Sequence, residues 1–264
     1  MFRILKTDLQ KALMSSEFYI AMAGICILNF LNLFDEIQIH TVKESCSVLY
    51  LYEARHALGA FSILILFLCA LPFGLNFCTE WNFENTRYNL IRTSKNKYGW
   101  SKVIVTAAMG FLACQIGYLL LIFCLNLYFP LYPSDSKDLE IYIRSSSFIE
   151  IARTKTPYYF FIGTLPESFS YGFLSVVALY ISSKITNIFV VLSAPILFYY
   201  GWNFLSGTLQ FPYILCWPSF MYKGIVSKLG SGYSLLYTMI YYLIGIIIIG
   251  ALFVKNVKRR IENE

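Results

Sequence analysis

Long apolar runs alternate with short polar segments along this 264-residue chain. Six runs approach the roughly 20 residues that a helix needs to cross a bilayer core. They span residues 18–34, 58–78, 103–128, 165–182, 188–207 and 235–254. Since backbone amides find no water in hydrocarbon, spans of this kind fold as helices. The pattern predicts an all-α membrane protein in which a six-transmembrane-helix bundle forms one domain over residues 1–264.

A further apolar pattern precedes the first run, in residues 1–16. Phe2, Leu5, Leu9 and Leu13 recur at helical spacing, with charged side chains on the other faces. This arrangement is typical of an amphipathic amino-terminal helix lying in the inner membrane interface. A frayed cytosolic tail is the alternative, and the sequence alone leaves it open.

The segment before the last run is apolar and aromatic, yet it is too broken to cross the membrane. Residues 208–234 are interrupted by Pro212 and Pro218. An apolar stretch of about 10–14 residues suits a re-entrant or interfacial hairpin, which we expect at the outer face. Cys216 in this segment can form a disulfide with Cys46 of the first outer loop only if the outside is oxidising and the loops meet.

Composition agrees with the membrane assignment, since only 14% of the residues are charged, against about 25% in soluble domains. Thirteen of the 21 lysines and arginines fall in residues 1–17, 79–102, 183–187 and 255–264. The positive-inside rule then places both termini on the cytosolic side of the plasma membrane. The net charge of +6 reflects this topology and an attraction to anionic membrane lipids, so we expect no nucleic-acid partner.

Groups for catalysis are scarce. The sequence contains no phosphate-binding loop of the form GxxxxGK[ST], no GxSxG elbow and no HExxH pair. We therefore expect no catalytic residues, no metal site and no cofactor bound directly by this chain. Glu167 stands within a predicted span, where it either lines a pathway or marks the helix boundary after Pro166. Together with the outer His40 and His56, it is too little for an intramembrane enzyme.

Residues 80–102, EWNFENTRYNLIRTSKNKYGWSK, form a net-basic segment between the second and third runs. Glu80 and Glu84 open it, and carboxylates in a first helical turn gain from the helix dipole. Apolar residues at helical spacing and a basic end follow. Two interpretations remain open on the residues alone: a basic loop held by lipid headgroups, or a short amphipathic helix seated in the groove of a cytosolic partner.

The order of these features resembles the membrane permeases of type-2 ATP-binding-cassette (ABC-2) exporters. In that family the cytosolic segment between spans two and three reads Glu, then Gly-Thr, a Leu-Leu pair, Pro-x-Ser-Arg, and a Lys at the start of span three. The positions that match here are Glu80 or Glu84, Thr86, Leu90 with Ile91, Ser94 with Lys95, and Lys102. Asn85 stands where glycine is usual, no proline follows the pair, and the spacing to Ser94 is about two residues short.

The resemblance implies a transport subunit that is not itself an enzyme. Residues 80–94 would be the coupling helix that binds a cytosolic ABC ATPase, through Glu80, Phe83, Glu84, Thr86, Arg87, Leu90, Ile91 and Ser94. ATP and magnesium would bind the ATPase, and a second permease chain would complete a homo- or heterodimer. The outer aromatic loops and the largely apolar spans suit an amphipathic peptide, lipid or drug-like substrate. The compact size and short loops resemble bacterial permeases for peptide export or for self-protection against antimicrobial peptides. A non-transporting membrane sensor or assembly factor is the alternative function.

Overall fold

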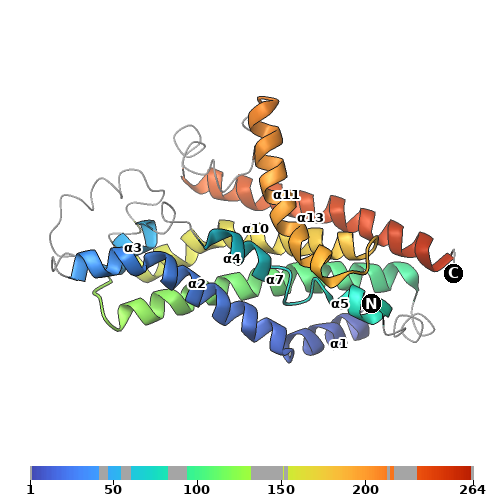
Figure 1. The fold of residues 1–264 in the computed structure, drawn as a ribbon, viewed down its shortest axis with the longest axis horizontal. Helices are drawn as coiled ribbons and strands as arrows, with labels where there is room; N and C mark the ends of the chain where they lie inside the picture. The colour runs from blue at the N-terminus through green and yellow to red at the C-terminus, as the bar shows by residue number, and fades with distance from the viewer. Residues whose placement is uncertain are drawn as a thin grey trace.

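The computed structural model describes residues 2–41, 47–54, 61–82, 94–131, 151, 154–212, 215–216 and 231–262. In these residues the regular structure is helical, which confirms the all-α prediction for this part of the chain (Figure 1). The helices are α1 (Phe2–Leu13), α2 (Ser16–Thr41), α3 (Val48–Ala54), α4 (Ser62–Leu68), α5 (Asn76–Asn82), α7 (Lys95–Asn126), α10 (Thr156–Ser182), α11 (Ile188–Thr208) and α13 (Ser231–Glu262).

Among the described helices, four are long and apolar enough to cross a membrane. The apolar parts are Ser16–Gln38, Lys95–Asn126, Ile188–Thr208 and Tyr233–Glu262. They coincide with the first, third, fifth and sixth runs of the sequence pattern, and they indicate a membrane protein. At 32 residues each, α7 and α13 extend well beyond the predicted spans.

The second run is not one unbroken helix, which corrects the expectation of a continuous span over residues 58–78. Its described part consists of α4, a series of turns over residues 69–75, and α5. Pro72 lacks a backbone donor and Gly74 is a poor helix former, so both interrupt the helix. The interruption is buried, and Ser175 Oγ of α10 donates a hydrogen bond to the Cys69 carbonyl oxygen. Non-helical backbone at membrane depth is tolerated where protein covers it in this way.

α10 begins at Thr156, nine residues before the predicted span of residues 165–182. Pro157 occupies the first turn, where a missing N–H costs nothing. Glu167 therefore lies inside the helix and not in its first turn, so its interpretation as a boundary residue is wrong. Its side chain is half-buried and contacts other groups of the protein. Whether Glu167 lines a pathway stays a prediction.

α10 lies at the centre of the bundle together with α7, because 17 of its 27 residues are buried and it packs against α7, α11 and α13. Two glycines let α7 and α10 approach closely. A Cβ on Gly172 would lie 2.8 Å from the Ala107 carbonyl oxygen, and one on Gly110 would clash with the Ser175 hydroxyl. Small residues of this kind are typical of membrane helix contacts, where backbones pack against each other directly.

Polar side chains within the apolar helices join neighbouring elements. Gln115 Nε2 on α7 donates to Thr164 Oγ1 on α10 at 2.8 Å, and Ser168 Oγ on α10 donates back to Gln115 Oε1 at 2.7 Å. Asn32 Oδ1 on α2 accepts from the Phe61 backbone N–H at the start of α4. Through these hydrogen bonds, Gln115 and Asn32 connect neighbouring helices.

The amino-terminal helix is ordered and packed, so the alternative of a frayed tail is wrong. Leu5, Leu9 and Ala12 of α1 pack against Phe73 and against the apolar surface of α7. Ser15 separates α1 from α2, and its Oγ accepts a hydrogen bond from the Phe18 N–H as a helix cap. The expected hairpin falls largely outside the described residues, and so does Cys46, while Cys216 is a free thiol.

Candidate functional site

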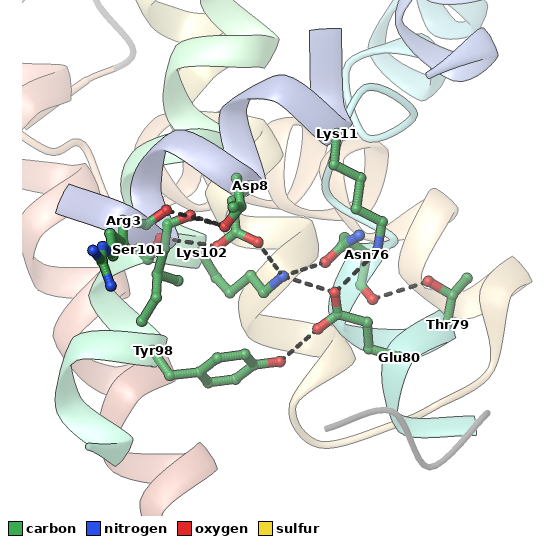
Figure 2. A network of polar contacts seen from close by, with 11 residues as sticks. Arg3, Asp8, Lys11, Asn76, Thr79, Glu80, Tyr98, Ser101 and Lys102 are labelled. Atoms are coloured by element: carbon green, nitrogen blue, oxygen red, sulfur yellow. Dashed lines mark hydrogen bonds and ion pairs between the residues drawn. The ribbon is translucent and has the colours of Figure 1, made fainter. Parts of the chain in front are cut away.

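Lys102 is the centre of a buried polar network at the meeting point of α1, α5 and α7 (Figure 2). Its side chain is 1% exposed. The Nζ atom donates to Asp8 Oδ1 at 2.9 Å, to Asn76 Oδ1 at 2.7 Å and to Glu80 Oε1 at 2.8 Å. An ammonium group carries three donors, so every N–H of Lys102 has an acceptor.

The two carboxylates of this network receive further donors. Ser101 Oγ donates to Asp8 Oδ2 at 2.8 Å, and Tyr98 OH donates to Glu80 Oε2 at 2.7 Å. Lys11 Nζ lies 3.1 Å from Glu80 Oε1. Asp8 and Glu80 are buried, whereas Lys11 reaches the network from an exposed position. Two carboxylates and two ammonium groups thus neutralise one another.

Helical spacing directs these side chains toward a common point. Tyr98, Ser101 and Lys102 stand at positions i, i+3 and i+4 of α7, while Asn76 and Glu80 are four residues apart in α5. Residues at these spacings share one face of a helix. The network residues of α1 are three apart and lie beside its apolar face. Three short sequence patterns therefore combine into one site only when the three helices pack together.

The buried charges make this site sensitive to the loss of any one partner. Removing two charges from water costs several kcal/mol per ion, and good geometry with full hydrogen bonding is needed to offset that cost. The network meets this condition at Lys102 and at both carboxylates. A complete network of this kind fixes one arrangement of its helices, because any other arrangement leaves a buried charge without a partner.

The environment of Glu80 has opposing effects on its pKa. Burial alone raises the pKa of the carboxyl group. The charge of Lys102, the hydrogen bonds from Lys102 and Tyr98 and the charge of Lys11 act in the opposite direction and outweigh burial. The pKa of Glu80 therefore lies below its ordinary value, and the ionised form prevails at neutral pH.

This lowered pKa predicts how stability depends on pH. A carboxyl group whose pKa is lower in the folded protein stabilises the fold above its unfolded-state pKa, near 4. The stabilisation is lost as the pH falls through the folded-state pKa. We expect Glu80→Gln to lower the melting temperature at pH 7 and to lessen the further loss on acidification. Thermal melts in detergent between pH 7 and pH 3 measure this.

Glu262→Gln is the control for this measurement, because its carboxylate is exposed and its ion pair with Lys95 is long, at 3.4 Å. Exposed pairs of this kind contribute little to stability. We expect its melting temperature to follow that of the unmodified protein throughout. If the melting temperature of Glu80→Gln fell with pH as steeply as that of Glu262→Gln, this would contradict a contribution of Glu80 to the pH dependence of stability.

Contacts beyond the network hold the end of α5. Arg260 of α13 stacks on Trp81, with its guanidinium carbon 4.1 Å from the ring centroid, and its Nη1 donates to the Ser183 carbonyl oxygen after α10. Asn82 Nδ2 donates to the Thr186 carbonyl oxygen in the turn between α10 and α11. The last residues of α5 are thereby joined to α13 and to the turn that ends α10.

The first residues of α7 are held at the same end of the bundle, where Figure 1 also shows both chain termini. Tyr98 OH donates to the buried Glu80, whereas the contact of Lys95 with Glu262 of α13 is exposed and weak. Residues 83–93 therefore connect two anchored positions, the end of α5 and the start of α7. We call the residues of the network and these two anchored ends the anchor site.

The residues selected from the sequence are only partly described. Glu80 lies in the anchor site, and Ser94 is the exposed residue before α7, without a hydrogen bond from its side chain to the helix amides. The other predicted contacts with an ATPase lie outside the described residues: Phe83, Glu84, Thr86, Arg87, Leu90 and Ile91. The structure therefore leaves the conformation of the predicted coupling helix as a prediction.

Sequence reasoning missed most of the anchor site. It identified Glu80 and Lys102 separately, from the resemblance, and did not pair them. It did not select Asp8, Tyr98 or Ser101. An aspartate between leucines of an amphipathic helix does indicate a carboxylate that needs a hydrogen-bonding or charged partner once it is buried. Only the packing of α1 on α7 reveals which partner it has.

No model of a known family, no characterised protein and no solved structure matches this chain. Within the described residues, no group of three or more histidine, cysteine, aspartate or glutamate side chains is arranged to hold a metal ion. The anchor site itself offers two carboxylates, but Lys102 lies between them and occupies the position that a cation would take. Its chemistry is that of a structural junction between three helices.

Proposed function

We propose that this chain is the membrane permease subunit of a type-2 ATP-binding-cassette exporter. A separate cytosolic ATPase would bind residues 80–94, and a second permease chain would complete the assembly. The anchor site is the observation that supports this proposal. It joins both ends of residues 83–93 to α1, to α13 and to the turn between α10 and α11.

This arrangement suits the transmission of force from an ATPase to the bundle. A displacement of residues 83–93 would pull on the end of α5 and on the start of α7, which Tyr98 and Glu80 join. Because Lys102 and Glu80 bind each other at 2.8 Å, α5 and α7 would move together. Domain movements driven by ATP act through rigid elements of this kind, and the bundle would open a path outward for an amphipathic substrate.

Six membrane crossings fit the packing of the helices. α4 begins beside Asn32 of α2, and α5 ends beside Lys11 of α1. Together, α4 and α5 therefore return the chain along α2, and we propose that they form the second crossing in two pieces. α10 would be the fourth, and residues 208–234 would form the re-entrant hairpin. Both termini lie at the end that carries the anchor site, as an even number of crossings requires (Figure 1).

The remaining assignments follow from this topology. The anchor end carries the basic termini, so it would face the cytosol of a bacterial cell, with the bundle in the plasma membrane. ATP and magnesium would bind the ATPase, which leaves this chain without enzymatic activity of its own. Membrane lipids and the second permease chain would cover the apolar surface, and we propose no nucleic-acid partner.

The coupling contact is tested by substitution within residues 83–93. We expect Leu90→Asp and Thr86→Arg to insert normally and to lose export, because each places a charge where an apolar or small group would meet the ATPase groove. The measurements are membrane insertion, co-purification of an ATPase with the tagged chain, and ATP hydrolysis by the purified complex. Asn96→Asp, at an exposed position of α7, is the matched control.

The outcomes distinguish a permease subunit from a non-transporting sensor or assembly factor. Export and ATPase association that remain unchanged in both variants would exclude residues 83–93 as the coupling contact. Failure of the unmodified chain to bring down any nucleotide-binding protein from its native host, or to support nucleotide-dependent transport, would favour the sensor or assembly factor.

A further inference from the structure

A cavity of about 510 Å³ lies between α10, α11 and α13, away from the anchor site. Its lining among the described residues is aliphatic and aromatic and includes Phe173, Phe198, Trp202, Tyr241, Gly245 and Ile248. Cavities of this volume are typical of small-molecule sites. We propose that this cavity binds a single hydrocarbon chain of a membrane lipid. The proposal does not depend on the export function.

The shape of the cavity favours one chain. Its lining residues on α13 extend from Tyr237 to Ile249, about 18 Å at the helical rise of 1.5 Å per residue. A volume of 510 Å³ over that length corresponds to an open channel about 6 Å wide for atom centres and about 9 Å wide from wall to wall. A single acyl chain has these dimensions.

The same dimensions argue against a second copy of the protein as the occupant. A helix with its side chains is about 10–12 Å across, too wide for this channel. Twelve of the described residues line the cavity, whereas a standard protein interface engages roughly 20–30 residues on each side. The cavity is therefore a ligand site by size and not a docking surface for a folded partner.

The polar atoms at one end are already satisfied. Trp202 Nε1 and Tyr241 OH both donate to the Leu215 carbonyl oxygen, at 3.1 and 3.3 Å. An apolar ligand in the cavity therefore leaves the hydrogen bonds of these two side chains intact, and it gains apolar contacts along its length. Leu215 lies between the end of α11 and the start of α13, so the polar group of the lipid would sit at that end, opposite the anchor site.

The membrane around α11 and α13 would supply the lipid. Both α11 and α13 are apolar enough to cross a membrane, so the open side of the cavity faces hydrocarbon. Toward one end α11 diverges from the bundle, and Figure 1 shows this part standing apart from the other helices. A lipid chain would fill the space that this divergence leaves beside α13.

Photolabelling tests the site in the intact protein. The chain is reconstituted in nanodiscs of phosphatidylcholine that contain a trace of phosphatidylcholine with a diazirine near the end of one acyl chain. Ile27 on α2 and Ile248 on α13 are equally exposed, at 57% and 55%, so bulk lipid labels them alike. We expect label on Ile248 and on the buried Phe173 to exceed that on Ile27 about tenfold, equivalent to 1.4 kcal/mol.

A variant that fills the cavity removes this preference. A Cβ on Gly245 would lie 2.7 Å from Phe173 Cε2, so Gly245→Leu crowds the cavity, and we expect labelling of α13 to fall to the level of Ile27. Gly207→Leu is the control, because nothing lies within 4 Å of a Cβ there. If Gly245→Leu fails to fold, competition in the unmodified protein decides: unlabelled long-chain lipid must suppress the Phe173 label, and an eight-carbon analogue must not.

Two results would overturn the proposal. Label distributed over α2 and α13 in proportion to exposure, without saturation, would mean bulk lipid only. An absence of label on the cavity together with efficient disulfide formation between two Ile248→Cys chains would mean that a second copy covers the site.

Discussion

The Lys102→Met variant is expected to lose about 3–5 kcal/mol of stability, the cost of removing one partner from a buried ion pair. Asp8 and Glu80 would remain buried without the ammonium group that each now binds at under 3 Å. Methionine has a similar length and no charge, so the change tests charge more than volume. Thermal or denaturant unfolding in detergent, followed by tryptophan fluorescence, measures the loss.

Lys97→Met is the matched control for this variant. Lys97 stands in the same helix, five residues earlier, and is exposed. Surface substitutions of this kind usually change stability by less than about 0.5 kcal/mol. Equal stability of Lys102→Met and Lys97→Met would show that the network does not hold α1, α5 and α7 together.

A second substitution distinguishes charge from packing. When Asp8→Asn is added to Lys102→Met, one of the two buried carboxylates that lost Lys102 disappears, so we expect part of the lost stability to return. Residues in direct contact show interaction energies of about 0.5–3 kcal/mol in such cycles. Additive losses in the double variant would mean that the two side chains act independently, against the 2.9 Å contact between them.

Hydropathy was sufficient to predict the helices that are apolar along most of their length. α2, α7, α11 and α13 each present a long apolar surface, and every one of them coincides with a predicted run. The prediction depends only on composition over about 20 residues, because the bilayer imposes that length on any spanning helix. Their ends were less well predicted: α7 begins eight residues before Val103, in a polar stretch that packs beside α1.

Long-range contacts determine the elements that the sequence did not reveal. Pro72 and Gly74 were visible in the second run, but the break is stabilised by Ser175, more than a hundred residues away. In the same way, α10 contains Pro166 and Glu167, which indicated a helix start. The structure instead buries Pro166 within a longer helix, whose other contacts outweigh the lost hydrogen bond.

The anchor site shows the same limit. Glu80 and Lys102 stand 22 residues apart, and Asp8 is 94 residues from Lys102. No local pattern indicates that these three side chains meet. A sequence does show that a charged residue lies beside leucines at helical spacing, but the identity of its partner depends on how α1, α5 and α7 pack.

Gly172→Ala is expected to destabilise the bundle by about 1–3 kcal/mol, the usual cost of inserting a methyl group into a tightly packed contact. The new Cβ would lie 2.8 Å from the Ala107 carbonyl oxygen, and a backbone atom within α7 cannot move aside alone. α7 and α10 would therefore have to separate along the central contact of the protein. Unfolding of the purified variant in detergent measures the loss.

Gly201→Ala makes the same chemical change in α11, where nothing lies within 4 Å of the new Cβ. Alanine is a better helix former than glycine by about 1 kcal/mol, so this variant should gain stability. Opposite signs for the two substitutions would identify close helix packing as the cause, since helix propensity favours alanine at both positions. A gain in stability at Gly172 as well would contradict the close approach of α10 to the Ala107 carbonyl oxygen of α7.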